Sequence, residues 1–516
     1  MKAPTKIHIA ALILAFFSIL PGWSQGRIIA KSDSKGSYRG GDFLKGNVRI
    51  RQGTTIIYCD SAYFIKEANM LELHRRVRIL DGDSVTITAA RAKYNTKGGI
   101  IELRGNVVYK QLGRVTLFTN FLDYDRNRGY ARYFNGGKLV DSTSVLTSQR
   151  GYFDKPNNLT SFGGNVKGTN PEWSMESDTL QYNSLTRIVH FLKPTKVVNN
   201  QGNVSEYETG TYNTFSKQST LRDGKFETES FIVIAETIVM NEATKSYSAR
   251  GKVFMQSKTD DTIVTGEHAI FDQANGLTKV YENALMKKPA GGGDTLFLKA
   301  DTLISIDPDP EDETKKRLLA YFNVKVYKND FQGKADSLAY VNADSTINFY
   351  GDPVLWALGT QLTADTLSLV TANNAIQQLK LLTNGYIITQ DTLFNFNQIK
   401  GRHITTYFRE NKIHKIDVQG NGESLYYVLE ENDSKVTGIN MVTCANMLVR
   451  FQDGLLKTIR FDMKPEGKFY PPHLITTKDS QLKGFDWRFD EKPKKEELFI
   501  AAPPAPSASA TPERSE

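Results

Sequence analysis

Residues 46–64 read GNVRIRQGTTIIYCDSAYF and contain the pattern that decides the fold. The pattern is centred on Asp60, with an apolar residue three positions before it, a small residue one before, and apolar or aromatic residues two and four after. It recurs about every 30 residues, and such self-similarity is typical of architectures that stack one unit on the next. Plain copies are centred on Asp60, Asn120, Asp178, Glu236, Glu267, Asp301, Asp336 and Asp365, and degenerate copies lie near Ala90 and Gln149.

The stretch opens on a second marker, Gly-Asn-Val at residues 46–48, which returns at residues 105–107 and 164–166. This marker keeps the phase of the Asp-centred pattern, so both belong to one repeating unit. Stacked units present extended surfaces, and the sequence therefore predicts a long surface or groove as the functional feature.

The unit is β-structure rather than helix. Apolar and polar residues alternate over residues 48–51 and 85–88, with turn residues between such runs. No Pro lies between Pro21 and Pro156, which suits consecutive paired strands because Pro cannot donate to a sheet ladder. One apolar face per strand predicts antiparallel sheet with one buried face. From typical strand lengths we expect roughly three strands per unit.

The apolar positions change parity across each Asp-centred pattern. A strand that keeps one face inward therefore needs an extra residue or a bend, and we expect a β-bulge at each centre. The acidic residue is assigned a structural role there, with its carboxylate capping backbone N–H groups. A calcium ladder and a carboxylate pair for glycoside hydrolysis are the alternatives. They are the weaker interpretations because the position also accepts Asn120, Ala90 and Gln149.

Four segments are expected along the chain. Residues 1–24 read as a secretory signal peptide, since Lys2 and Lys6 precede a short apolar run and small residues precede Gln25; a retained anchor is the alternative. Residues 25–205 and 206–490 are expected to form two β-repeat regions. Residues 491–516 are expected to form a disordered tail rich in Pro, Ala and Ser.

Charge differs between the two expected regions. Residues 25–205 carry 27 Lys plus Arg against 15 Asp plus Glu, whereas residues 206–516 carry a net charge of −6. The basic part predicts attraction to an anionic surface or ligand such as lipid phosphates; a solvated β surface that happens to be basic is the alternative. Because the chain carries an export signal, nucleic acid is not expected as a partner.

No catalytic or metal-binding constellation stands out in the sequence. The seven histidines do not pair at metal-site spacing, and the sequence has no paired-Cys motif, G-x-S-x-G elbow or P-loop. Cys59 occupies the small position of its copy and is interpreted as a core residue. A disulfide between Cys59 and Cys444 is the less favoured alternative. We therefore expect neither a metal nor a cofactor, and no enzymatic activity.

The sequence resembles the OstA/LptA family of periplasmic lipopolysaccharide-export proteins, in particular the OstA-like proteins of the Bacteroidetes group. The residues that carry the resemblance are Gly-Asn-Val-Arg-Ile at 46–50, Gly-Thr at 53–54 and Ile-Tyr-Cys-Asp at 57–60. That family's repeat similarly runs G-N-V, a short turn with G-T, and an alternating strand that ends in a small residue and Asp. The resemblance is firmest over residues 27–200 and continues, through the repeat alone, to residue 450.

The resemblance implies an all-β fold, a repetitive antiparallel β-jelly roll shaped like a taco and open along one seam, in two stacked OstA-like parts. It implies a non-enzymatic bridge that carries the acyl chains of lipopolysaccharide, or a related acylated glycolipid, toward the outer membrane. The expected location is the periplasm, with association to the outer membrane. The expected protein partners are the inner- and outer-membrane components of the export machinery, bound through edge-strand pairing.

In such a bridge an apolar groove holds the acyl chains, and each buried methylene contributes roughly 0.8 kcal/mol without any catalytic group. The inward residues of the repeat would line this groove. They are Val48, Ile50, Ile57, Ala62, Phe64, Leu71, Leu73, Leu117, Leu122, Tyr124, Met175, Leu180 and Tyr182.

Two other functions remain open. The first is a structural or adhesive β-solenoid of the cell envelope, in which the same residues fill a closed core and no lipid is carried. The second is a carbohydrate-active β-helix enzyme, which needs two convergent carboxylates, or an Asp with Lys or Arg, in one cleft.

Overall fold

The computed structural model describes residues 28–499 apart from 39, 84, 112–114, 126, 142, 310, 358, 373–374, 410–411, 431–434, 453–454 and 477–479. The chain divides into two compact units, the first ending at Ala249 and the second beginning at Arg250. The expected division after residue 205 falls instead within strand β17 (Val204–Asn213), which pairs with β16 (Thr195–Asn199) and with β18 (Gln218–Glu227). The expected signal peptide, residues 1–24, lies outside the described residues.

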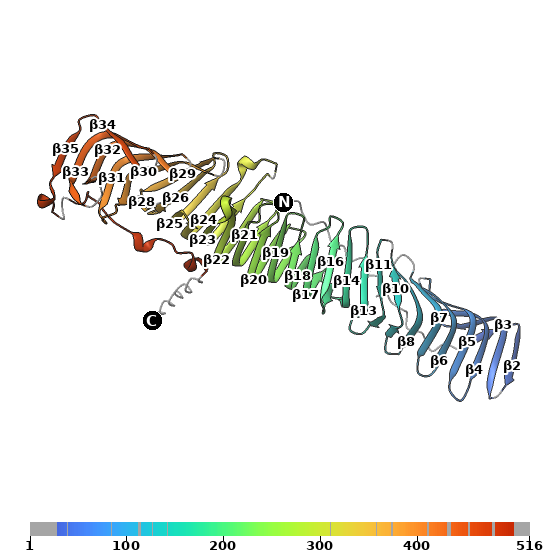
Figure 1. Cartoon of the computed structure of the whole chain (residues 1–516). Coiled ribbons are helices and arrows are strands. Elements are labelled where there is room, and N and C mark those ends of the chain that lie inside the picture. Colours follow the sequence, from blue (N-terminus) through green and yellow to red (C-terminus); the bar gives the residue numbers. More distant parts are fainter. Residues whose placement is uncertain are drawn as a thin grey trace, which may run out of the picture. The chain divides into compact units, whose positions relative to one another are not determined.

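The first unit is built from antiparallel strands that follow one another in space as in sequence (Figure 1). The unit boundary falls within β20 (Ser246–Ser257). The other strands of this unit are β1 (Ile29–Lys31), β2 (Ser34–Tyr38), β3 (Gly41–Gln52), β4 (Thr55–Ile65), β5 (Met70–Asp81), β6 (Val85–Asn95), β7 (Ile100–Gln111), β8 (Thr116–Asp125), β9 (Tyr130–Tyr133), β10 (Gly137–Val140), β11 (Val145–Ser148), β12 (Arg150–Asp154), β13 (Leu159–Thr169), β14 (Trp173–Asn183), β15 (Ile188–Phe191), β16, β17, β18 and β19 (Phe231–Asn241).

The second unit is also built from antiparallel strands, of which β30, β32 and β33 are the longest at 16–18 residues. Its strands are β21 (Ile263–Asp272), β22 (Leu277–Ala290), β23 (Asp294–Ile306), β24 (Arg317–Lys328), β25 (Phe331–Val341), β26 (Thr346–Tyr350), β27 (Val354–Ala357), β28 (Thr360–Thr363), β29 (Thr366–Ala372), β30 (Ala375–Gln390), β31 (Phe396–Arg409), β32 (Lys412–Leu429), β33 (Val436–Gln452), β34 (Leu455–Asp462) and β35 (Glu466–Tyr470). Short 3₁₀ helices are η2 (Gly291–Gly293), η3 (Glu313–Lys315), η4 (Pro472–Leu474), η5 (Phe489–Glu491) and η6 (Glu496–Phe499).

The predicted fold class is confirmed, because the described residues form 35 strands and no α-helix. The expectation of three strands per repeat is wrong, since β4 and β5 together span one repeat. Each strand is long because it passes through the repeat centre without ending. Because a bulge and not a turn lies at the centre, two strands of 11 and 12 residues span the repeat for which three shorter strands were expected.

The predicted bulges are present, and the extra residue lies on the Gly-Asn-Val strands. Between the pairs Lys45↔Ser61 and Val48↔Cys59 the register shifts, so Gly46 and Asn47 together oppose Asp60. Both of these residues have positive φ, 78° and 45°. Gly adopts this left-handed conformation freely and Asn tolerates it, which explains why the marker is Gly-Asn. The same shift recurs along the first unit, as between Arg104 and Val107.

The bulges bend each strand into two halves. β8 shows this directly, because one end of it pairs with β10 and the other end with β9. We call half A the part that contains residues 48–52 and 55–59, with its equivalents in later repeats. Half B contains residues 41–45 and 61–65 and their equivalents.

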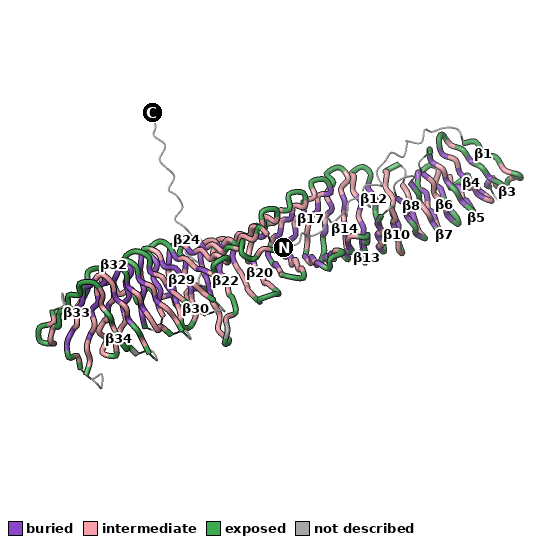
Figure 2. The backbone as a smooth tube through the Cα atoms, turned by 90° about the horizontal axis from the view of Figure 1, so that it is seen from above, coloured by how far each residue is buried: buried purple, intermediate pink, exposed green. Residues whose placement is uncertain are grey.

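The inner faces of the two halves contact each other and form the core. The rings of Phe191 in half B and Tyr207 in half A lie 5.5 Å apart, edge to face. The Tyr133 hydroxyl of half B and the Ser148 hydroxyl of half A share a hydrogen bond of 2.6 Å. In Figure 2 buried positions alternate with partly exposed ones along the strands, while the turns at both edges are exposed. The apolar parity change is therefore what keeps both halves of one strand facing the same interior.

Residues 480–499 form an extended segment, here called the C-terminal strap, which crosses the strands of the second unit (orange-red in Figure 1). Residues 491–499 belong to the expected disordered tail, yet Leu498 is buried against Leu285 and Phe297. Burial of this apolar residue explains why order extends past residue 490. The rest of the expected tail, residues 500–516, lies outside the described residues.

Candidate functional site

The inner face of the first unit consists of continuous rows of side chains, one residue from each strand. One row of half B, here called the aromatic row, runs without a gap from β4 to β19. Every second member as far as Tyr212 is aromatic, and the members between are aliphatic or small. In order they are Phe64, Leu71, Tyr94, Ile101, Tyr124, Ala131, Phe153, Thr160, Tyr182, Val189, Tyr212, Ser219 and Met240.

All thirteen predicted groove residues lie on this inner face. Phe64, Leu71, Tyr124 and Tyr182 belong to the aromatic row, and eleven of the thirteen are buried. The exceptions are Phe64 and Tyr124, which are partly exposed. The others divide between a second row of half B (Ala62, Leu73, Leu122, Leu180) and half A (Val48, Ile50, Ile57, Leu117, Met175).

Three aromatic members of the row, Tyr94, Phe153 and Tyr212, were not predicted from the sequence. The repeat spacing in the sequence is sufficient to predict two of them. Tyr94 lies four positions after Ala90 and Phe153 four after Gln149, the two degenerate centres. Applying the repeat spacing to these centres, despite their missing acid, would have identified both residues.

The interior is filled by side chains of the two halves. Leu180, Tyr182 and Val189 have no exposed surface, and Leu73 and Leu103 retain 1%. Glycines make room for the largest of these side chains: a Cβ atom at Gly151 would lie 2.2 Å from the Tyr133 ring. Side chains packed this tightly leave no space for a water molecule beside them, so an apolar guest has to displace them.

A few polar groups lie inside near the edge of half A. Thr55 and Asp81 are buried there, and the Thr55 hydroxyl donates to the Asp81 carboxylate at 2.8 Å. Burial, with smaller contributions from Tyr124 and Asp81, raises the pKa of Tyr109 to about 12. The phenol is therefore neutral at physiological pH. Tyr109 belongs to half A and Tyr124 to half B, so the two halves approach each other here.

The turns beside the aromatic row share a side-chain cap. The Asn183 side-chain oxygen accepts from the N–H groups of Leu185 and Thr186. The N–H of Ser184 donates to the carbonyl of Asn158 in the preceding turn at 2.9 Å. Neighbouring turns are thus linked to one another, which gives this edge a regular backbone.

The acidic residues at the repeat centres hold the bulges, but not as expected. At Asp60, Asp301 and Asp365 the carboxylate accepts from a side chain of the neighbouring strand, namely Arg76 Nε (2.8 Å), Asn323 Nδ2 (2.8 Å) and Asn384 Nδ2 (3.1 Å). The expected cap on a backbone N–H occurs at Asn120, which accepts from Asn106 N at 3.2 Å. Each partner is a residue with positive φ, so the centre stabilises the strained position of the bulge.

The described residues offer no metal site. No cluster of three or more His, Cys, Asp or Glu side chains is positioned to hold a metal ion among them. Cys59 and Cys444 are free and buried. Burial is the main cause that raises the pKa of the Cys59 thiol to about 11, and Asp60 adds to it, so the thiol stays protonated.

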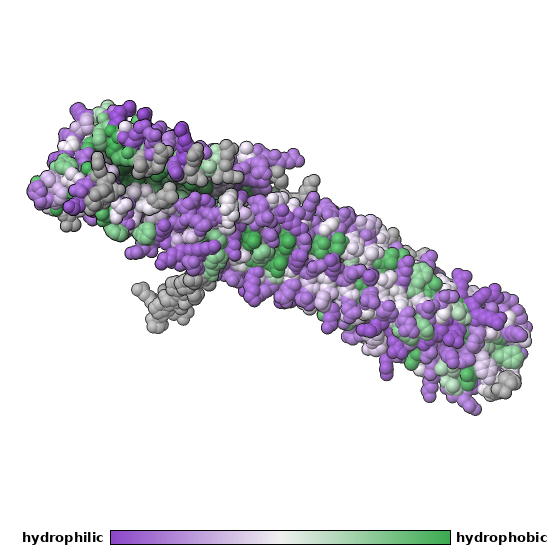
Figure 3. Space-filling view, viewed as in Figure 1, coloured by the Kyte–Doolittle hydropathy of each residue, from purple (hydrophilic) through white to green (hydrophobic). Residues whose placement is uncertain are grey.

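The outer face of the first unit is polar and charged. Lys167 and Glu176 form an ion pair of 2.7 Å, and Lys196 and Glu206 form one of 2.8 Å beside it. Figure 3 shows hydrophilic side chains over most of the visible surface. The chain thus separates a dry interior from a wet exterior strand by strand.

One family of known proteins is similar to the N-terminal part of the chain. The family model for OstA-like protein matches residues 31–178. This part of the chain is therefore similar to OstA-like proteins. The matched segment covers β2 to β13 and most of the aromatic row, so the resemblance seen in the sequence is confirmed where it was expected to be firmest.

Other comparisons add less. Among the solved structures that match is the crystal structure of LptH, described as the LptA-homologous periplasmic component of the lipopolysaccharide transport device from Pseudomonas aeruginosa. The two chains are 13% identical over 33% of this chain and 84% of that chain, with a TM-score of 0.12. A TM-score this low carries no weight, so the fold rests on the strand pairing itself. No curated protein gives a significant match.

None of the helices in the described part of the chain has the length and apolar character needed to cross a bilayer.

Proposed function

We propose that this protein is a non-enzymatic bridge that binds the acyl chains of lipopolysaccharide, or of a related acylated glycolipid, between the two halves of its bent sheet. The observation that carries the proposal is the continuous aromatic row, which gives one inner position on each half-B strand from β4 to β19, apolar on all of them except β13 and β18. The OstA-like match, which covers the row as far as Thr160, supports it. An acyl chain needs such a continuous apolar path and no reacting group.

Binding in this account begins at the edge that carries the aromatic row. Phe64 and Tyr124 are the predicted groove residues that are partly exposed, so a lipid would contact them first. A Tyr ring has an apolar face and a polar hydroxyl, which suits a position between a dry interior and water. The halves would then part along this edge, and each methylene buried between them contributes about 0.8 kcal/mol.

Location and partners follow from the same proposal. The protein acts in the periplasm after export and carries lipid toward the outer membrane. It contacts inner- and outer-membrane components of the export machinery through edge strands, where free backbone N–H and C=O groups pair with another chain. The basic outer face of the N-terminal strands attracts the phosphates of the cargo.

A structural β-solenoid without lipid is the second candidate, and one observation favours it. The inner residues are buried by one another, and the hydrogen bond between Tyr133 and Ser148 ties the two halves together. A closed core of this kind has no need to open.

Photo-crosslinking in cells separates the two functions. A photoreactive amino acid replaces Phe64 or Tyr124, with the outward and exposed Arg49 and Arg51 as controls. The bridge predicts lipopolysaccharide adducts at the inward positions alone. A folded, exported protein that gives adducts at neither set would instead be a closed solenoid.

A further inference from the structure

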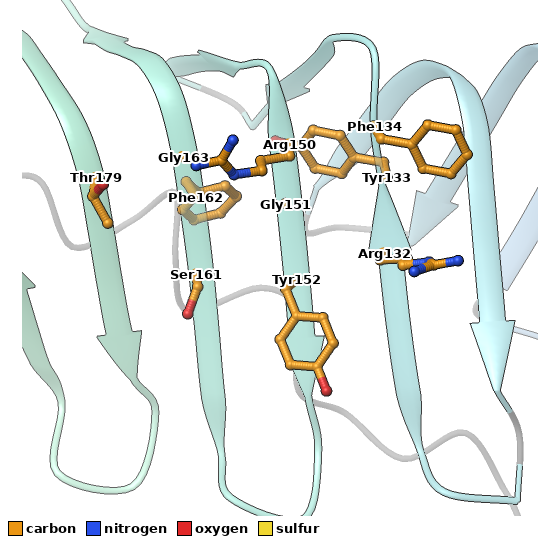
Figure 4. Close-up of a pocket in the computed structure, with 10 residues that line it drawn as sticks. All are labelled: Arg132, Tyr133, Phe134, Arg150, Gly151, Tyr152, Ser161, Phe162, Gly163 and Thr179. Carbon is orange, nitrogen blue, oxygen red and sulfur yellow. The ribbon is translucent and has the colours of Figure 1, made fainter.

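The outer face of half B in the first unit has a depression of about 500 Å³ between β9 and β14. Its residues are labelled in Figure 4, where Arg150 extends from β12 toward Gly163 on β13. The depression exists because the neighbouring strands carry small side chains there, Ser161 and Gly163 on β13 and Thr179 on β14. Arg150 and Tyr152 on β12 form its opposite wall.

An arginine–aromatic cluster borders the depression. Arg104 binds Asp123 at 2.6 Å and Glu102 at 3.2 Å, and Arg132 binds Asp123 at 3.1 Å. The guanidinium groups of Arg104 and Arg132 lie 5.5 and 5.9 Å from the centre of the Phe134 ring. These two arginines therefore have carboxylate partners, and the cluster holds their side chains in place.

Arg150 differs from both. Its side chain is exposed, and no carboxylate of the described residues pairs with it. None of the ten residues that line the depression is acidic. Its charge is therefore available to an anion, and a guanidinium binds phosphate or carboxylate oxygens in a fixed, often bidentate, geometry.

Tyr152 supplies a flat apolar surface beside this charge. It is 39% exposed, and Tyr130 packs against it with the ring centres 5.7 Å apart. Burial and the nearby Asp154 raise the pKa of Tyr152, so its hydroxyl is a donor at neutral pH. Ser161 and Thr179 add two more hydroxyl groups along the floor.

A second depression on the same unit shows that a hollow of this size does not by itself indicate an anion-binding site. It has a similar volume of about 520 Å³ and is lined by Lys167, Glu176, Lys196 and Glu206, among others. There the lysines pair with the glutamates at 2.7 and 2.8 Å, so their charges are already satisfied.

We infer that the depression at Arg150 and Tyr152 binds a phosphorylated sugar ring, with the phosphate on Arg150, the apolar face of the ring on Tyr152, and the sugar hydroxyls over Ser161 and Thr179. The site lies on the outer face, so it is separate from the apolar interior and does not depend on lipid binding there. The ligand is either a free sugar phosphate or the phosphorylated saccharide of a glycolipid.

Calorimetric titration of the purified full chain tests the inference with four probes: glucose 1-phosphate, glucose, inorganic phosphate and de-acylated lipopolysaccharide. Glucose 1-phosphate is expected to bind at least about tenfold more tightly than glucose or phosphate, since a charge-assisted hydrogen bond and the ring contact each contribute on the order of a factor of ten. Tighter binding of de-acylated lipopolysaccharide identifies a glycolipid saccharide as the source, and tighter binding of glucose 1-phosphate identifies a free metabolite.

Two variants and one control locate the site. Arg150→Gln and Tyr152→Ala should each weaken binding of glucose 1-phosphate by about tenfold. Arg222→Gln is the matched control, because Arg222 is exposed on the same outer face of half B in β18 and should leave binding unchanged. No binding of the phosphorylated sugar, binding equal to that of inorganic phosphate, or equal binding by Arg150→Gln overturns the inference. Crosslinking of lipid at Phe64 in the same variants reports separately on the bridge function.

Discussion

The outer face of half A differs between the two units. In the first unit it carries exposed ion pairs such as Lys167–Glu176. In the second unit the corresponding outer positions include Tyr386, Ile388, Leu425 and Tyr427, all buried. Leu482 of the C-terminal strap packs among them, with Phe485 and Trp487 beside it. The second unit therefore has apolar residues on both faces of these strands, and the strap shields the outer set from water.

Buried glutamines fix the strap in place. The Gln398 side-chain oxygen accepts from Leu482 N at 2.8 Å, and its amide donates to the Ser480 carbonyl at 3.0 Å. Gln361 does the same one step further along, accepting from Arg488 N and donating to the Asp486 carbonyl, both at 2.7 Å. Each glutamine is 1% exposed. The strap thus satisfies polar groups that would otherwise be buried without partners, which makes it a structural part of this unit.

The interiors differ as well. The row of the second unit that corresponds to the aromatic row carries Phe271 and Tyr340 in its first part. From β29 to β33 it has no aromatic member and contains Leu369, Leu379, Thr406, Ile416 and Val449. A row rich in Tyr suits an edge that meets water, whereas an aliphatic row suits a permanently dry core. We therefore expect the opening edge of the proposed bridge where the row is richest in aromatic residues, which is in the first unit.

The largest expected effect tests whether the two units behave independently. Leu180→Asp puts an unpaired charge where no surface is exposed, and should destabilise the first unit by at least about 3 kcal/mol. Hydrogen exchange should rise in β12 to β17 and stay unchanged in β28 to β31, because stacked repeats interact mainly with their neighbours. Gln181→Asp, one residue on and facing outward, is the control. Equal loss of protection in both units would contradict this independence.

The next effect concerns the strap. Leu482→Ala removes a side chain that is 5% exposed within the outer apolar cluster, and should cost about 2–4 kcal/mol in the second unit. Denaturant unfolding followed by hydrogen exchange should show the loss in β30 to β32 only. Leu474→Ala, at a position 56% exposed, should cost less than about 0.5 kcal/mol. If the two variants behave alike, the strap is not part of the fold.

A smaller effect appears in acid. Hydrogen bonds from Arg488 and Lys334 lower the pKa of Glu491 to about 2. Because its pKa is lower in the folded state, ionised Glu491 stabilises the strap at pH values above the ordinary glutamate pKa of about 4.3. This contribution is lost as the pH falls from about 4.3 toward 2. Acrylamide quenching of tryptophan fluorescence should therefore rise over that range as Trp487 becomes accessible.

Glu491→Gln should remove most of this pH dependence. The control is Glu176→Gln, which breaks an ion pair of the first unit and should leave the acid transition of the strap unchanged. A transition of the same size in Glu491→Gln and in the native protein would show that other groups control the strap.

The smallest effect is a gain in stability. Arg75 and Arg76 occupy the bulge positions that elsewhere carry Gly and Asn, with φ of 62° and 47°. Arg75→Gly relieves a left-handed conformation and should stabilise the first unit by about 1 kcal/mol in denaturant unfolding. Gly46→Ala, the reverse change at an equivalent bulge, should destabilise it. A loss of stability on Arg75→Gly would mean that the side chain contributes more than the strain costs.

Sequence periodicity predicted the first unit better than the second for a physical reason. In β3 only one face is buried past the bulge, so Val48 and Ile50 stand out against the exposed Arg49 and Arg51. In β30 the consecutive residues Tyr386, Ile387 and Ile388 are all buried, because the strap covers the outer face. Alternation disappears there, and no short-range pattern reveals a segment about 100 residues later in the chain that covers the strand.

The sequence predicted which residues lie on the inner face, but it did not predict the depression on the outer face. Inner positions such as Leu180 and Tyr182 were found because they follow an acidic centre at fixed spacing. The depression at Arg150 was not found. It depends on the small residues Ser161 and Gly163 of β13. The strand register places them beside Tyr152 and Arg150 of β12, and this register is visible only in the folded sheet.

The central claim is that the aromatic row contacts acyl chains. The most direct measurement places a photoreactive amino acid at Phe64, Tyr94 and Tyr212 in turn, and at the residue before each, Tyr63, Lys93 and Thr211. Adjacent residues of a strand point to opposite faces, so each control lies at the same height on the outer surface. The account predicts lipopolysaccharide adducts at all three row positions and at none of the controls. Adducts at the outer positions, or at none of the six in a folded and exported protein, would contradict it.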